Sequence, residues 1–440
     1  MTDMAIKTAE TNERVSDTDT PARVRNLKQR RRAELRFQGY GILAVTVAGI
    51  FLVIMLGSIF IRGYSAFWTY EVQMPIFFDP AVIDPDGTRD PTDLRRANYA
   101  ALIRDSLYDT FPDVTSRGDR RTLGSLISRG AAAELQNMVT ADPGLIGTRQ
   151  TVSVPVASDV AMILKGQIDR TLPESDRTIT DQQLGWIDQL DAAGNIDAVL
   201  NTRFLSTGDS REPELAGVWG AVVGSFYALL VCFLISFPIA VMAAVYLEEF
   251  APHNRWTDLI EVNINNLAAV PSIVFGLLGL AVFLNFFTMP RSAPLVGGMT
   301  LALMTLPTII IASRAALKAV PPSIREAARG LGASDTQTTG HHVLPLAMPG
   351  ILTGTIIGMA QALGETAPLL MIGMVAFVVD IPGSPTDAAT ALPVQVYLWA
   401  DSPERGFVEK TSAAALILVF FLVLMNALAV MLRKRFERRW

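Results

Sequence analysis

The chemically most informative single residue is a carboxylate inside an apolar run. Glu365 falls within the apolar stretch 346–379, where an acidic side chain costs about 2.5–3.5 kcal/mol on membrane-insertion scales. We expect it to face the interior of a helix bundle and to find a partner there, either in a gate or in a structural ion pair. No Gly-x-x-x-x-Gly-Lys-Ser/Thr phosphate loop occurs in the sequence. The chain therefore carries no recognisable ATP-hydrolysing site.

A second informative segment, residues 320–345, predicts two short helices at a sharp angle. Proline opens the first helix, glycines end it, and a capping-box pattern starts each helix. Such an element between two membrane spans is suited to seat in a groove on a soluble partner, although an ordinary helical hairpin would read similarly. The pattern consists of Pro321 and Pro322, Ser323 with Glu326, Gly330 and Gly332, and Ser334 with Gln337.

Six apolar runs are each candidates to cross a bilayer core of about 30 Å. Lys and Arg crowd the segments before the first run and after the last, which predicts that both termini are cytoplasmic. The loop 248–263 fits this rule poorly, because Arg255 is its only basic residue among several acidic ones. The runs are 39–61, 216–247, 267–289, 295–313, 346–379 and 411–432.

The domain organisation follows from these runs. Residues 1–38 are polar and basic, and we expect them to be a disordered cytoplasmic tail. After the span 39–61, the acidic block 62–214 predicts a soluble α/β or α+β domain on the exterior side, held without disulfides because Cys232 is the only cysteine. Residues 215–432 form a five-helix core with the cytoplasmic loop 318–345, and 433–440 is a basic cytoplasmic end. The net charge of −5 and the absence of a basic soluble face argue against a nucleic-acid binder.

The 320–345 segment resembles the Glu-Ala-Ala loop of ABC-importer permeases. The resemblance rests on Glu326-Ala327-Ala328, on Gly332, and on Leu344-Pro345 at the family's spacing. It implies an α-helical polytopic membrane protein with the type I importer permease fold, about six transmembrane helices, and an inserted exterior domain. It also implies that this loop docks on a separate ATPase subunit, which would bind ATP and magnesium, while this chain carries no cofactor and no metal and is not itself an enzyme.

More of residues 216–432 is similar to the A-type (PstA-like) subunit of the phosphate-specific permeases. The matching strings include Tyr246-Leu-Glu-Glu-Phe250, Val270-Pro-Ser-Ile-Val-Phe-Gly276 and Gly364-Glu-Thr-Ala-Pro-Leu369. This resemblance implies a bacterial inner-membrane, multi-pass location and phosphate import. It also implies a second homologous (C-type) permease, ATP-binding subunits and a periplasmic phosphate-binding protein as partners. The domain 62–214 would then be periplasmic, and it lies outside the common core of the family.

The resemblance places a translocation pathway or gate at Gln361, Gly364, Glu365 and Thr366. Two arginines that the family often carries are replaced here by Gln361 and Ile311. Arg314, one turn after Ile311, could stand in for the second, or it could be an anchor that extends to the cytoplasmic interface.

Three other functions compete with phosphate import. The same machine could carry sulfate, molybdate or phosphonate. A membrane sensor could bind a ligand in block 62–214, but it would need a cytoplasmic output domain. A secondary transporter would have no use for a loop that docks an ATPase.

Overall fold

The computed structural model describes residues 21–375 and 377–436. The chain forms two units, Met1–Ile59 and Phe60–Trp440. Helix α2 (Pro21–Gly63) begins in the first unit and contains 43 residues, so it is about 65 Å long at 1.5 Å per residue. This is longer than a bilayer core, and the predicted disorder of residues 1–38 is therefore wrong for 21–38, which are helical. Residues 1–20 of that prediction lie outside the described part.

Residues 64–206, which we call the insert domain, fold around a small antiparallel sheet. Strand β1 lies in the centre and pairs with β2 on one side and β3 on the other. The α+β form of the predicted domain is confirmed. Its elements are η1 (Tyr64–Phe67), β1 (Trp68–Phe77), α3 (Pro80–Ile83), α4 (Pro91–Arg96), α5 (Tyr99–Thr110), α6 (Arg117–Gly124), α7 (Ala131–Ala141), η2 (Pro143–Leu145), β2 (Arg149–Pro155), α8 (Ser158–Leu164), η3 (Glu174–Asp176), α9 (Asp181–Ala192), β3 (Ile196–Leu200) and α10 (Thr202–Ser206).

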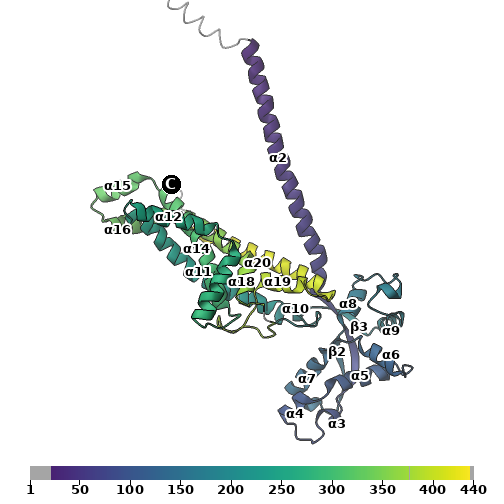
Figure 1. Cartoon of the computed structure of the whole chain (residues 1–440). Helices are drawn as coiled ribbons and strands as arrows, with labels where there is room; N and C mark the ends of the chain where they lie inside the picture. Colours follow the sequence, from purple (N-terminus) through teal and green to yellow (C-terminus); the bar gives the residue numbers. More distant parts are fainter. Residues whose placement is uncertain (1–20, 376, 437–440) are drawn as a thin grey trace, which may run out of the picture. The chain divides into compact units, whose positions relative to one another are not determined.

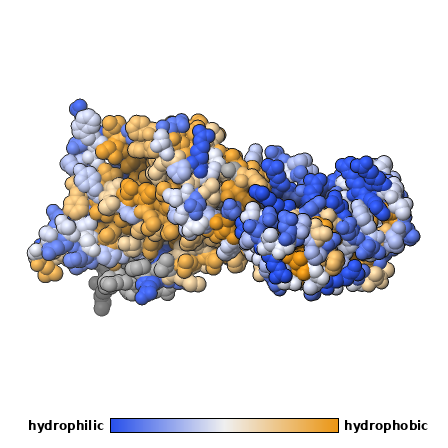
Figure 2. Space-filling view, turned by 90° about the horizontal axis from the view of Figure 1, so that it is seen from below, coloured by the Kyte–Doolittle hydropathy of each residue, from blue (hydrophilic) through white to orange (hydrophobic). Residues whose placement is uncertain are grey.

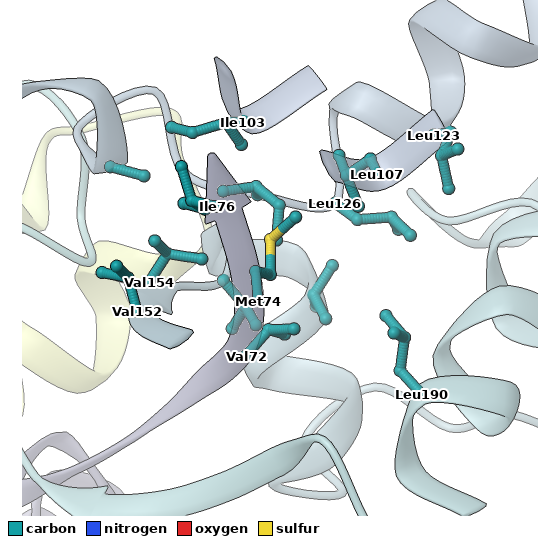
Figure 3. Close-up of a cluster of buried hydrophobic side chains, with 14 of the residues drawn as sticks. Val72, Met74, Ile76, Ile103, Leu107, Leu123, Leu126, Val152, Val154 and Leu190 are labelled. Atoms are coloured by element: carbon teal, nitrogen blue, oxygen red, sulfur yellow. The ribbon is translucent and has the colours of Figure 1, made fainter. Parts of the chain in front are cut away.

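The core of the insert domain is apolar and is built on one face of the sheet. Alternate side chains of β1 are buried, and Val72 and Met74 lie opposite Val154 and Val152 of β2. Helix α5 covers this face with Ile103 and Leu107, together with side chains from α6, α7 and α9 (Figure 3). The alternation of strand residues thus produces a domain that holds together by packing alone.

The remaining helices, residues 219–436, form what we call the helical core. Figure 2 shows hydrophobic residues covering this part, whereas the visible face of the insert domain is largely hydrophilic. Large apolar side chains of α11 and α20 are exposed, as in helices that contact lipid. The elements are α11 (Trp219–Val245), η4 (Tyr246–Phe250), α12 (Arg255–Ala268), α13 (Ser272–Gly279), η5 (Leu280–Phe286), α14 (Pro294–Lys318), α15 (Pro322–Gly330), α16 (Asp335–Gln337), η6 (Thr338–Val343), α17 (Leu344–Gly364), α18 (Ala367–Met371), α19 (Leu392–Ala400) and α20 (Gly406–Phe436).

The described residues contain five helices long and apolar enough to cross a membrane, or six if one bent pair counts as a span. That pair is α12 with α13–η5, which meet at 101° around Pro271. The predicted span 267–289 therefore contains the bend, and its part after Pro271 is the second arm, α13–η5. A proline at the junction cannot continue the helix from α12, so the second arm starts at Ser272 in a new direction.

The predicted span 346–379 is also broken. Helix α17 ends at Gly364, Glu365 has an extended backbone, and α18 starts at Ala367. Pro368 explains the break, because it has no N–H to donate to the carbonyl four residues earlier, Gly364, and its ring would clash with that carbonyl.

Helices α14 and α17 form an antiparallel hairpin with very close backbones. A Cβ added to Gly354 of α17 would lie 2.1 Å from the Cβ of Ala312 in α14. Only glycine permits this approach, which fixes the two helices that enter and leave the 318–345 loop.

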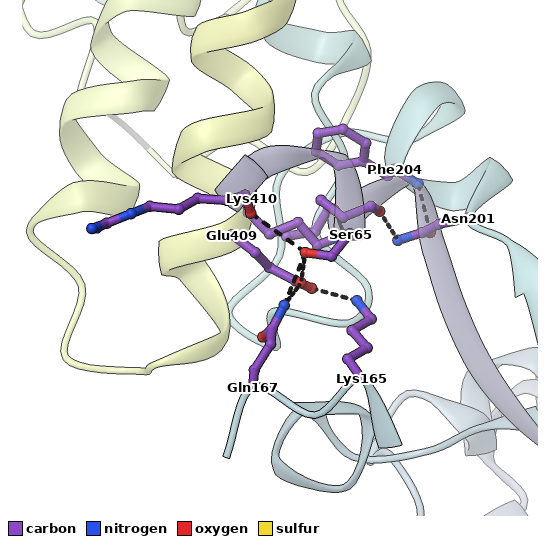
Figure 4. A network of polar contacts seen from close by, with 10 residues as sticks. Ser65, Lys165, Gln167, Asn201, Phe204, Glu409 and Lys410 are labelled. Carbon is purple, nitrogen blue, oxygen red and sulfur yellow. Dashed lines mark hydrogen bonds and ion pairs between the residues drawn. The ribbon is translucent and has the colours of Figure 1, made fainter. Parts of the chain in front are cut away.

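A buried polar joint connects the insert domain to the start of α20 (Figure 4). The Lys165 Nζ atom lies 2.6 Å from Glu409 Oε1, and these side chains are only 8% and 11% exposed. Glu409 Oε2 accepts further hydrogen bonds from Ser65 Oγ at 2.9 Å and Gln167 Nε2 at 2.8 Å. The next residue, Lys410, is buried, with its Nζ 4.4 Å from the Phe204 ring centroid.

Candidate functional site

The 318–345 loop consists of two short helical segments separated by a tight turn (Figure 1). The predicted capping box of Ser334 with Gln337 is confirmed, with Ser334 Oγ accepting from the Gln337 backbone N–H at 3.2 Å. The predicted box of Ser323 with Glu326 is wrong. Helix α15 starts at Pro322 after Pro321, so Ser323 lies inside the first turn and does not cap it.

The turn after α15 is closed by a glycine in the left-handed region. Gly332 has φ +89°, its N–H donates to Arg329 O at 2.9 Å, and the Ala333 N–H donates to Ala328 O at 3.1 Å. This pair of bonds is the Schellman arrangement, which satisfies the last carbonyls of a helix and favours glycine at that position. The turn leaves Leu331 with 91% of its surface exposed. A large apolar side chain is thus presented at the tip of the loop.

Charged residues fix the base of α15 to the neighbouring helices. Arg325 Nη2 lies 2.6 Å from Glu249 Oε1 and its Nε 3.2 Å from Oε2, a two-point contact with side chains 18% and 6% exposed. Arg325 also donates to the carbonyls of Leu317 and Val320 at 3.0 and 2.8 Å, which caps the end of α14. The hydrogen bond to Glu249 raises the pKa of Arg325 above its ordinary value.

A second group of ion pairs surrounds Arg314 of α14 and Glu248 of η4. Arg314 Nε is 2.5 Å from Glu248 Oε1, and its Nη2 is 2.8 Å from Glu261 Oε2. Lys318 Nζ approaches Glu248 at 3.5 Å. Together with the Arg325 pair, these contacts join η4, α12, α14 and α15 at one end of the helical core.

Two family models match the chain. The Binding-protein-dependent transport system inner membrane component family matches residues 236–440, and a Domain of unknown function (DUF3333) matches residues 24–174. Phosphate transport system permease protein PstA 1 of Mycobacterium tuberculosis is 31% identical over 228 residues, which cover 52% of this chain and 73% of that protein. PstA of Pasteurella multocida is 30% identical over 220 residues, covering 49% of this chain and 76% of that protein. The chain is a PstA-like member of the ABC transporter permeases.

Two further comparisons match a smaller part of this permease or have a lower sequence identity to it. The probable ABC transporter permease protein YqgI of Bacillus subtilis is 34% identical over 172 residues, which span 39% of this permease and 58% of that relative. Among solved structures, the MetNI methionine ABC transporter in inward-facing conformations is 19% identical, with a TM-score of 0.39, covering 50% of this permease and 95% of that chain.

The predicted loop residues of this permease lie together on and around α15 and η6. Glu326 and Ala327 are exposed, whereas Ala328 is buried on the inner side of the helix. Pro345 is exposed, and Leu344 is half-buried against the apolar cluster beneath the loop. The outer face of α15 is therefore open and its inner face is packed.

The predicted pathway residues divide between two places. Gln361, Gly364, Glu365 and Thr366 lie at the end of α17, where Gln361 and Gly364 are exposed and the other two are half-buried. Glu365 forms no ion pair with any described residue, so its expected partner is not found in the described part of the chain.

Arg314 is not brought close to the other pathway residues. The hairpin pairs Gly354 with Ala312 and Gly358 with Ile309, so the end of α17 lies about 15–20 Å along α14 from Arg314 at 1.5 Å per residue. Arg314 is instead occupied by two carboxylates.

Sequence reasoning misses three features of this site. Leu331 lies between two glycines. A large apolar residue in an otherwise polar turn is a sequence signal for an exposed contact residue. Glu248 and Glu249 belong to a family string in a loop with too few basic residues. The excess of negative charge in this loop is a signal that its carboxylates pair with basic residues elsewhere in the chain. Those residues are Arg314 and Arg325.

Proposed function

We propose that this chain is the membrane-spanning permease subunit of an ATP-driven importer of inorganic phosphate. The 318–345 loop docks on a separate ATPase subunit, and a second, homologous permease completes the translocation pathway. A periplasmic binding protein delivers the anion. The observation that carries the proposal is the rigid loop that presents Leu331 and the exposed face of α15.

The shape and anchoring of the loop support docking on an ATPase. The Schellman turn at Gly332 holds the exposed Leu331 side chain in a defined place. The Arg325–Glu249 contact ties the same helix to η4. A helix with one exposed face and one anchored face suits transmission of a partner's movement into the long helices.

The two ends of the helical core support opposite sides of the membrane for the loop and the insert domain. Helix α11 starts near the insert domain and runs to η4, which contacts α15 through Glu249, and α20 starts at the Lys165–Glu409 joint (Figure 1). With basic residues at both chain ends, the loop is cytoplasmic and the insert domain periplasmic in this proposal.

Phosphate as the solute is supported by the phosphate permeases among the relatives. The residues of the proposed pathway give less support for phosphate as the solute. Gln361 stands where the family often has arginine, and the Arg314 guanidinium is paired with Glu248 and Glu261. The pathway would therefore take its remaining positive charge from the second permease. A different oxyanion, such as sulfate or molybdate, is the competing candidate.

Uptake by proteoliposomes containing the complete transporter tests this proposal. We expect ATP-dependent uptake of [³²P]phosphate that excess unlabelled phosphate suppresses and that equal concentrations of sulfate or molybdate leave unchanged. Suppression by sulfate or molybdate would assign a different solute. ATP-independent uptake at the full rate would contradict the coupling to an ATPase.

A further inference from the structure

A large cavity lies between the insert domain and two segments that lead into the helical core. Its volume is about 1250 Å³, and its walls come from α5, α6 and the start of α7, from residues 211–214 before α11, and from residues 403–406 before α20. This exceeds the roughly 300–1,000 Å³ of sites for single drug-sized ligands. It is accordingly far too large for one inorganic phosphate ion alone.

The walls of this cavity carry an excess of arginine. Seven arginines line it against four acidic residues, an excess of three positive charges in a chain whose net charge is −5. Arginine recognises phosphoryl groups through two parallel N–H···O contacts, and it keeps its charge at every physiological pH. A local excess of this residue type in an acidic protein therefore favours an anionic ligand.

Four of the seven arginines have no side-chain partner among the described residues. Arg104 of α5, Arg117 and Arg121 of α6, and Arg405 before α20 form no ion pair and no side-chain hydrogen bond within the described part of the chain. Arg117 and Arg121 are one turn apart and share a helix face. All four are exposed, so guanidinium groups from three separate elements line one concave space that is open to solvent.

The other three arginines already have partners and help to shape the wall. Arg120 donates to the carbonyl of Val114 and lies over the Tyr108 ring, 4.6 Å from its centroid. Arg129 approaches Glu212 at 3.7 Å, and Arg211 lies over the ring of Phe377.

One acidic wall residue is buried beside the cavity. Glu214 is 8% exposed, and its Oε2 atom has no hydrogen-bond partner among the described residues. Burial raises the pKa of Glu214, so desolvation disfavours the negative charge of this side chain at the wall.

We propose that this arginine-lined cavity binds a soluble anion with several phosphoryl groups, of the inorganic polyphosphate class. The volume calls for more than one phosphoryl group, and the spread of Arg104, Arg121 and Arg405 over three elements matches an extended anion. The same ligand would touch both the insert domain and the segment that leads to Glu409. The proposal is independent of the import function, because it concerns the isolated chain.

Titration calorimetry on the purified full-length chain in detergent tests the proposal, with tripolyphosphate as the probe. We expect binding that weakens with salt and is tighter than that of orthophosphate or sulfate. The variant Arg121→Gln/Arg405→Gln should bind at least about tenfold more weakly. The matched control, Arg95→Gln/Arg96→Gln, removes two exposed arginines of α4 that do not line the cavity and should change the affinity by less than about twofold.

Several outcomes would overturn the proposal. They are no tripolyphosphate binding by the wild-type chain, equal affinities of the cavity variant and the control, or orthophosphate binding as tightly as tripolyphosphate. Tighter binding of an acidic peptide would assign the cavity to a protein partner instead. None of these results depends on the ATPase, so they are distinct from a failure of phosphate uptake.

Discussion

Arg325 of α15 and Glu249 of η4 form a two-point contact, with N···O distances of 2.6 and 3.2 Å, across 76 positions of sequence. The same guanidinium group caps the end of α14 through the carbonyls of Leu317 and Val320. One side chain therefore connects the loop proposed to meet the ATPase with the end of α14 and with η4, which directly follows α11.

Removing Arg325 should uncouple the loop from the helices. Arg325→Ala leaves Glu249 buried without a partner, and breaking one side of such a pair costs about 3–5 kcal/mol. We expect loss of phosphate uptake while the protein still inserts in the membrane, measured by transport and by membrane fractionation. Arg149→Ala is the control, because its pair with Asp109 is exposed and lies in the insert domain, away from the loop. Equal uptake by the two variants would refute the role of Arg325.

Gly332 should tolerate no side chain, whereas Gly330 should. A Cβ added to either glycine would meet open space, but only Gly332 has a positive φ, of +89°. Gly332→Ala should therefore cost about 1–2 kcal/mol of local stability, and Gly330→Ala should be neutral or slightly stabilising. Limited proteolysis of the loop in membranes measures the difference. Equal cleavage rates would show that the turn does not require glycine.

The joint between the insert domain and α20 should depend on both charges. Lys165→Met leaves Glu409 buried and unpaired and should cost about 3–5 kcal/mol, seen as a lower thermal unfolding temperature. The double variant Lys165→Met/Glu409→Met should recover most of this loss. Arg170→Met, which breaks the exposed pair with Asp188, should cost at most about 1 kcal/mol. A double variant no more stable than Lys165→Met would contradict the pairing.

The stability effect of Glu214 should vary with pH. Burial raises its pKa in the folded state, so folding favours the protonated carboxyl. Its stabilising contribution is complete below the unfolded-state value of about 4.3 and is lost as the pH rises through the folded-state value. Glu214→Gln should therefore unfold at nearly the wild-type temperature at pH 4 and at a higher temperature at pH 8. The opposite order would show that the buried carboxylate is stabilised as an anion.

The sequence predicted the long helices well, because uninterrupted apolar runs leave few alternatives to a membrane helix. Pro271 and Pro368 indicate kinked spans, but the sequence did not predict that the helices stop there, since apolar composition continues through both positions. The α+β insert domain was predicted only by class, because its core depends on contacts between β1 and helices far along the chain.

The candidate site was also predicted only in part, because local sequence patterns specify turns but do not specify contacts between distant segments. Local capping patterns located the turn around Gly332 and the start of α16. The partners of Arg314 and Arg325 come from η4 and α12, more than fifty positions earlier, and no local pattern specifies such pairs. Leu331 was missed because exposure of an apolar residue is a property of the folded turn.

Docking of the 318–345 loop on the ATPase is tested by a photo-crosslink from position 331. A photoreactive amino acid replaces Leu331 in membranes that contain the complete transporter, and a second sample carries it at Leu172 of the insert domain. We expect an adduct with the ATPase subunit from position 331 and none from position 172. An ATPase adduct from position 172, or its absence from position 331 in membranes that still import phosphate, would show that the loop does not dock on the ATPase.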